Sequence, residues 1–305
     1  MMLILLLTLE IVNGLIFSNK NRALKNIQAT QSTSTDTGTN IEVSLMQSIY
    51  IEYTDAFQIV LNSNYPMFTE RALQSHHNND NDNDKYSQYG RLIKCKKMMF
   101  TKPVSLGHQL SFYIHQGRKS SVGLTVKAYS SSSSDDEEIC FTATGAVLQP
   151  LPPPSPLSPP PLQPHTHKSS YITYPDEIDH NYQYTTRTIF NLLERGRSDV
   201  LGGPLVLATA ITSGVKIVVA RVNDYNYYYR NCNSSGNGNG SKVSVLTNID
   251  NLGLMVNFHQ AIVEDGSDGS GGVVIATATV SCMCVDDNNN AIQFPSGLIN
   301  TASIE

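Results

Sequence analysis

The sequence predicts an α+β protein in which one unit, made of a short strand, a helix and four antiparallel strands, occurs twice. The first observation behind this prediction is a repeated segment at residues 49–73 and 171–200. Each copy has a β-like run, an Asp, a polar turn and a helix-like stretch, with a Glu-Arg pair at the same interval after the Asp. The second observation is that four alternating apolar runs follow each copy. Together they indicate two successive domains of one kind.

Apolar residues at helical spacing predict the helix of each copy. The two apolar faces consist of Tyr65, Phe68 and Ala72 in the first copy and of Ile189, Leu192, Leu193 and Gly196 in the second. Residues 201–204 read Leu-Gly-Gly-Pro, which is a strong stop signal because neither Gly nor Pro favours a helix interior. We therefore expect the second helix to end there.

Alternating runs rich in β-branched residues predict the strands that follow each helix. The runs lie at 91–101, 110–115, 122–129 and 139–148, and at 215–222, 242–248, 254–263 and 273–285. Polar inserts separate some of them, at residues 78–84, 130–138, 231–241 and 265–272. We expect these inserts at hairpin tips and a curved sheet around each helix. The tyrosine-rich residues 225–229 are expected at the edge of a strand or loop, with the lining of an acyl or head-group pocket as the alternative.

A Pro-rich stretch at residues 150–168 marks the boundary between the two domains. Its sequence is typical of a stiff polyproline II spacer, although such a segment could also bind an SH3-type partner. The domains are predicted at residues 41–149 and 169–288, followed by a C-terminal tail at 289–305. A chain of 305 residues is long enough for two domains with a core each.

The first 40 residues are excluded from the fold and interpreted as a targeting region. Residues 1–17 are signal-like and apolar except for Glu10 and Asn13, but too short and interrupted for a stable membrane span. Residues 18–40 begin with a basic, Ser- and Thr-rich stretch of transit-peptide composition. In this order the segments resemble the bipartite presequence of algae with complex plastids, which implies a plastid protein. A secretory protein, or a cytoplasmic one with a disordered extension, is the alternative.

Composition argues against several classes of partner and site. The net charge of −5, without a basic stripe, makes a nucleic-acid partner unexpected. The five cysteines are odd in number and mostly lie inside β-like runs, so we expect small buried apolar residues rather than disulfides. The histidines show no ligand spacing, so neither a metal nor a cofactor is expected.

The repeated segment resembles the hotdog-fold thioesterases, in particular the 4-hydroxybenzoyl-CoA thioesterase-like group. The residues that carry the resemblance are Asp55, Asn62, Tyr65, Phe68 and Glu70 to Ala72 in the first copy and Asp179, Thr186, Ile189 and Glu194 to Arg197 in the second. The approach to Asp179 and the Gly196-Arg197 ending also resemble plant plastid acyl-lipid thioesterases. The resemblance implies two tandem hotdog domains, each a curved antiparallel sheet wrapped around a central helix.

The resemblance also implies an acyl-thioester hydrolase of fatty acid metabolism that acts on acyl-CoA or acyl-carrier-protein substrates. Asp55 and Asp179 are the catalytic candidates, as general base or nucleophile. Asn62, Tyr65 and Thr186 are the candidate substrate-binding residues. In this family the site lies between two hotdog units, so the Asp of one unit would work against the helix start of the other. We expect this pairing within the chain, with a homodimer or higher oligomer as a further expectation.

The same residues also have ordinary structural interpretations. Asp is favoured in turns and at helix N-caps, and Asn62 and Thr186 could cap their helices. For the Glu-Arg pairs, a surface or interdomain salt bridge is the simplest role.

Both copies depart from the family in the turn after the Asp. Gln58 and Tyr182 stand where the family often has Gly, and Ile59 and Gln183 stand where a His often follows. These departures leave open a non-catalytic double hotdog that binds an acyl group or serves as a scaffold. A hotdog hydratase or dehydratase is the second alternative, although neither copy shows the His that the dehydratase branch normally carries.

Overall fold

The computed structural model describes residues 41–55, 58–80, 90–115, 124–131, 138–149, 167–179, 183–228, 242–251, 253–264, 272–295 and 298. Residues Asn40–Glu305 form one compact unit. The signal-like and transit-like segments, most of the Pro-rich linker and most of the polar inserts lie outside the described residues. No helix in the described part is long and apolar enough to cross a membrane.

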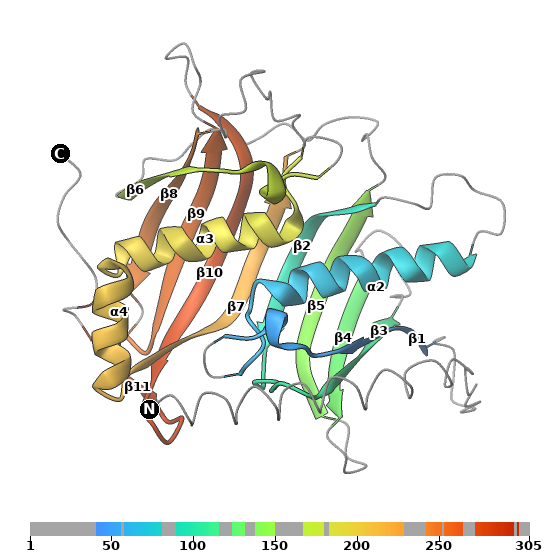
Figure 1. Cartoon of the computed structure of the whole chain (residues 1–305), viewed down its shortest axis with the longest axis horizontal. Helices are drawn as coiled ribbons and strands as arrows, with labels where there is room; N and C mark the ends of the chain where they lie inside the picture. Colours follow the sequence, from blue (N-terminus) through green and yellow to red (C-terminus); the bar gives the residue numbers. More distant parts are fainter. Residues whose placement is uncertain are drawn as a thin grey trace, which may run out of the picture. The chain divides into compact units, whose positions relative to one another are not determined.

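The elements follow the predicted order twice (Figure 1). The first half contains β1 (Ile41–Ser48), α2 (Asn64–Asp80), β2 (Arg91–Phe100), β3 (Gln109–His115), β4 (Leu124–Ser131) and β5 (Glu138–Gln149). The second half contains β6 (His167–Ile172), α3 (Thr186–Val200), α4 (Gly203–Thr212), β7 (Lys216–Tyr227), β8 (Lys242–Asn251), β9 (Met255–Glu264), β10 (Val273–Val285) and β11 (Ala291–Ile292).

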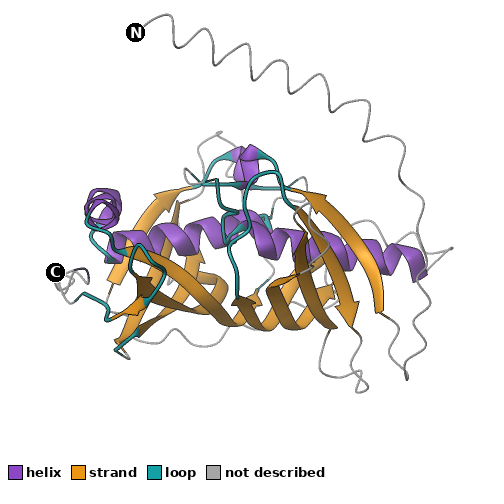
Figure 2. Ribbon diagram, turned by 90° about the horizontal axis from the view of Figure 1, so that it is seen from below, coloured by secondary structure: helices purple, strands orange, loops and turns teal. Residues whose placement is uncertain are grey.

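All strands belong to one sheet, in which the two halves have the same strand order in opposite directions. The order is β1-β3-β4-β5-β2-β7-β10-β9-β8-β6, with β11 paired to β10. The halves join where β2 pairs antiparallel with β7, for example Met98 with Val222. The sheet curves around α2 and α3, which lie on its concave side (Figure 2). The pairing of two hotdog units within the chain is therefore a continuous sheet.

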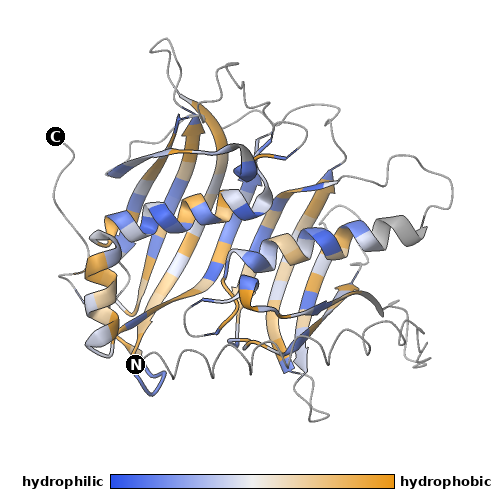
Figure 3. Cartoon of the chain, in the orientation of Figure 1, coloured by the Kyte–Doolittle hydropathy of each residue, from blue (hydrophilic) through white to orange (hydrophobic). Residues whose placement is uncertain are grey.

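The helix faces that the sequence predicted to be buried are buried. Phe68, Ala72, Ile189 and Leu192 are all 0% exposed in the core between helices and sheet. Gly196 brings α3 close to β8, because an added Cβ would lie 2.6 Å from a methyl carbon of Val245. Hydrophobic residues also gather along the strands in Figure 3. Burial of such faces is the main force that holds helices on a sheet.

The β-like run before each Asp is not a continuous strand, although the second run begins with Tyr171 and Ile172 inside β6. β1 and β6 end at Ser48 and Ile172, and short 3-10 helices follow at Ile51–Tyr53 and Pro175–Glu177. In the second copy the physical reason is Pro175, which lacks the N–H that a ladder needs. In the first copy the chain turns through a hydrogen bond from the Tyr53 N–H to the Tyr50 carbonyl, at 3.0 Å.

Two features of α4 and β7 were not expected from the sequence. The stop signal does end α3 at Val200, but Pro204 then lies in the first turn of α4, a position that proline favours. α4 is strongly hydrophobic (Figure 3), yet Leu205 is 84% exposed. Tyr225 and Tyr227 lie at the C-terminal end of β7, whose last residue is Tyr227. They are 0% and 1% exposed in β7, because β7 is a central strand of the joined sheet.

The cysteines agree with the prediction of small buried residues. Cys95, Cys140, Cys282 and Cys284 are buried and free, whereas Cys232 lies outside the described residues. Burial raises the pKa of Cys95 to about 12 and that of Cys140 to about 12, so these thiols stay protonated at neutral pH.

Candidate active site

Asp55 and Asp179 each begin a loop that is closed by the same pair of hydrogen bonds. The Asp55 N–H donates to the Ile59 carbonyl at 2.8 Å, and the Ile59 N–H donates to Asp55 Oδ1 at 3.0 Å. In the second half, the Asp179 N–H donates to the Gln183 carbonyl at 2.7 Å, and the Gln183 N–H donates to Asp179 Oδ1 at 3.0 Å. Both aspartates therefore have the turn role that their residue type favours, in the segment that leads into a hotdog helix.

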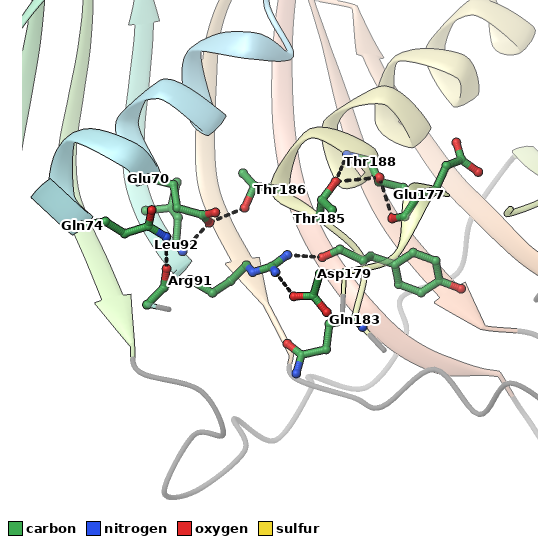
Figure 4. Close-up of polar contacts among 12 residues, drawn as sticks. Glu70, Gln74, Arg91, Leu92, Glu177, Asp179, Gln183, Thr185, Thr186 and Thr188 are labelled. Carbon is green, nitrogen blue, oxygen red and sulfur yellow. Dashed lines mark hydrogen bonds and ion pairs between the residues drawn. The ribbon is translucent and has the colours of Figure 1, made fainter. Parts of the chain in front are cut away.

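Asp179 reaches across to the other half of the chain. Its Oδ2 forms an ion pair with Nη2 of Arg91, the first residue of β2 (Figure 4). The same guanidinium donates through Nη1 to the carbonyl of Tyr184. The side chains of Arg91 and Asp179 are only 7% and 13% exposed, so this pair is shielded from solvent. The family arrangement led us to expect that Asp179 faces the start of the helix in the other half. Its ion pair with Arg91 runs to the strand β2.

Glu70 connects α2 to the start of α3. Its Oε2 accepts hydrogen bonds from the Leu92 N–H at 2.8 Å and from Thr186 Oγ1 at 2.5 Å (Figure 4). For the Glu70-Arg71 pair we expected a surface or interdomain salt bridge. Glu70 instead accepts two hydrogen bonds at the junction of the halves. In the second copy Glu194 is exposed, and Arg195 pairs with Glu177 at 3.3 Å.

The three candidate substrate-binding residues have different surroundings. Thr186 is 1% exposed and is the first residue of α3, but it does not cap the helix as the structural alternative assumed. Thr185 is the N-cap, and its side chain accepts a hydrogen bond from the Thr188 N–H at 3.1 Å. Asn62 is half-buried in the turn before α2. Tyr65 is 3% exposed in the core, with its ring 5.0 Å from that of Phe141.

Two buried polar residues beside this junction were not among the candidate catalytic or substrate-binding residues. Gln183 is 0% exposed, and within the described part of the chain neither Nε2 nor Oε1 of its amide has a hydrogen-bond partner. The Tyr225 hydroxyl is likewise buried without a partner there. Burial raises the pKa of Tyr225 well above its ordinary value, and the Glu70 carboxylate adds to this effect. The available sequence signals were the place of Gln183 where the family often has a His and the place of Tyr225 in the tyrosine-rich residues 225–229.

A solvent-open cleft lies against the outer face of α3. Its volume is about 340 Å³. The cleft is lined by Leu61 of the first half and by Tyr171, Asn191, Glu194, Arg195, Ser198, Asp199 and Pro204 of the second. Neither candidate aspartate lines it. Within the described residues, no group of three or more His, Cys, Asp or Glu side chains is placed to hold a metal ion.

No model of a known protein family and no curated protein matches the chain. Solved structures share its fold. An acyl-ACP thioesterase from Bacteroides thetaiotaomicron superposes with a TM-score of 0.50 at 11% identity, covering 80% of this chain and 97% of its own. The 12:0-ACP thioesterase from Umbellularia californica superposes with a TM-score of 0.52 at 9% identity, covering 81% of this chain and 94% of its own. At such identities the likeness concerns the fold, and it confirms the predicted α+β hotdog fold.

Proposed function

We propose that this protein hydrolyses acyl thioesters, with acyl-CoA or acyl-carrier-protein molecules as substrates. The observation that carries the proposal is the pair of equivalent Asp loops, each placed just before a hotdog helix, of which the second meets the other half through Arg91. The likeness in fold to two acyl-ACP thioesterases over most of their length supports the same substrate class. Fold alone does not define a reaction, so the Asp loops are the functional part of the proposal.

The chemistry needs a base or nucleophile and a group that stabilises negative charge. An Asp carboxylate takes a proton from water, and the water oxygen adds to the thioester carbonyl carbon. N–H groups in the first turn of a helix are suited to stabilise the oxyanion that forms. The C–S bond then breaks, and the departing thiolate takes up the proton. The products are a carboxylic acid and a free thiol, which is the acyl-group carrier.

The proposal is tested by incubating the purified protein with short, medium and long acyl-CoA and acyl-carrier-protein substrates. Release of free thiol together with free acid is the expected result. A parallel incubation with enoyl and 3-hydroxyacyl thioesters detects hydration or dehydration, which would favour the hydratase alternative. Tight acyl-CoA binding without any product would favour the non-catalytic alternative, and either of these outcomes contradicts hydrolysis.

A further inference from the structure

Gln183 is a polar side chain that the fold buries without satisfying it. The residue is 0% exposed, and both polar atoms of its amide lack a partner in the described part of the chain. Native proteins pair the great majority of buried polar side-chain atoms, because an unpaired one lowers stability. A chain that keeps such a group is expected to use it.

The unsatisfied amide lies next to the ion pair at the junction of the halves. The Gln183 backbone N–H holds Asp179 Oδ1 at 3.0 Å, so the side chain starts directly beside the carboxylate. In Figure 4 the Gln183 amide extends below the Asp179 carboxylate and the Arg91 guanidinium. The carboxylate is 13% exposed, which leaves this place close to the surface. A neutral donor and acceptor thus stands beside a buried charged pair.

The first half has the same loop without the amide. Ile59 stands at the position of Gln183 and makes the same two backbone hydrogen bonds with Asp55. Its side chain is apolar and can neither donate nor accept a hydrogen bond. The two Asp loops are therefore closed by equivalent hydrogen bonds but differ in the chemistry that they offer to a bound molecule.

We propose that the second loop is the reactive one and that the Gln183 amide holds the attacking water against the Asp179 carboxylate. This inference rests on the proposed thioester hydrolysis. The water donates one hydrogen to Gln183 Oε1 and the other to Asp179. As Asp179 takes that proton, the oxygen adds to the thioester carbonyl carbon, the C–S bond breaks, and the thiolate leaves with the proton from Asp179. Arg91 positions the carboxylate through their ion pair, and Asp55 closes its own loop as a structural residue.

The test compares Gln183→Leu with Ile59→Leu, its matched control in the first loop. Gln183→Leu removes the hydrogen bonds but keeps a similar size, so we expect kcat for thiol release to fall by ~10- to 1,000-fold with little change in KM. Because the change also removes an unsatisfied buried amide, the midpoint of thermal unfolding is expected to stay equal or rise. Ile59→Leu is expected to leave both quantities unchanged. Gln183→His, which restores a neutral donor and acceptor, is expected to recover part of kcat.

The outcomes separate this inference from the proposed function. If the wild-type protein releases thiol and Gln183→Leu has the same kcat, the role of Gln183 is contradicted but the proposed function is not. If kcat falls only in proportion to the folded fraction, the Gln183 amide has a structural role, and this result also contradicts the inference. A larger loss of kcat in Asp55→Asn than in Asp179→Asn assigns the reaction to the first loop and overturns the inference. Absence of thiol release by the wild-type protein contradicts the proposed function, and this inference with it.

Discussion

Asp55 and Asp179 each combine a loop-closing role with a charged group, so a substitution at either residue changes geometry as well as charge. Both carboxylates accept a hydrogen bond from a backbone N–H four residues later. This bond explains why a turn and a catalytic interpretation fit the same residue. Activity measurements on Asp variants must therefore be normalised to the folded fraction.

Arg91 offers a stability test of the junction between the halves. Arg91→Met leaves the Asp179 carboxylate buried without its counter-charge, so we expect a loss of about 3–5 kcal/mol in the free energy of unfolding, measured with urea. Arg71→Met is the matched control, because Arg71 is exposed, and its effect is expected to stay within about 0.5 kcal/mol. Equal effects of the two substitutions would show that the ion pair does not hold the junction.

The sequence alone was enough to locate the two aspartates, but not the residues that contact the site from the other half of the chain. The repeated interval to the Glu-Arg pair was enough to align Asp55 with Asp179. Arg91 lies 88 residues before Asp179, in a strand of the other half, and no local pattern connects them. The hydrogen bond from Thr186 to Glu70 spans 116 residues and was equally hidden. Such contacts depend on how the halves pair, which is a tertiary property.

Among the elements, the helices and long strands were predictable and the short elements were not. All eight predicted strands correspond to β2–β5 and β7–β10, because alternating apolar residues directly reflect a sheet with one buried face. The 3-10 helices at Ile51–Tyr53 and Pro175–Glu177 were mistaken for strand ends. α4 was missed because the Gly-Gly-Pro sequence that ends one helix also provides the proline that begins another.

Gly196 tests the packing of α3 on the sheet. In an isolated helix, Gly→Ala would stabilise by about 1 kcal/mol. Here the added Cβ would meet Val245 at 2.6 Å, so we expect Gly196→Ala to destabilise the protein by about 1–3 kcal/mol in urea unfolding. Ser198→Ala on the same helix is the control for helix propensity. Val245→Ala in the Gly196→Ala background should recover part of the loss, and a stabilising effect of Gly196→Ala alone would refute the close packing.

For the whole molecule, the decisive feature is the pairing of β2 with β7. It turns two repeats into one 11-stranded sheet and brings the second Asp loop against the first half. The resemblance to hotdog thioesterases implied that two units pair within the chain. Composition and periodicity alone could not have shown which strands form the joint, since β2 and β7 have the same alternating pattern as their neighbours.

Stability is expected to fall between neutral pH and pH 5. Burial lowers the pKa of His115 and of His167, and the nearby Lys127 lowers that of His115 further. As the pH falls, the unfolded chain binds protons at about pH 6.5, before the folded chain does. The stability that the two neutral histidines contribute is therefore present above that pH and lost below it. The lowered pKa of Asp286 acts only at more acidic pH.

The measurement is the midpoint of thermal unfolding at pH 5 and pH 7.5 at constant ionic strength. We expect a lower midpoint at pH 5. The His115→Gln/His167→Gln double variant, which cannot take up these protons, is expected to show a smaller difference between the two pH values. Equal pH dependence in the double variant and the wild-type protein would exclude the two histidines as its source.

Thioester hydrolysis by the Asp loops is tested most directly by comparing the wild-type protein with the Asp55→Asn/Asp179→Asn double variant. The quantity to measure is the rate of thiol release per folded molecule from the best acyl-CoA or acyl-carrier-protein substrate, with circular dichroism as the measure of folding. If an aspartate in these loops activates water, the double variant loses ~100- to 10,000-fold in rate. A double variant that releases thiol as fast as the wild-type protein would contradict a catalytic role for both aspartates.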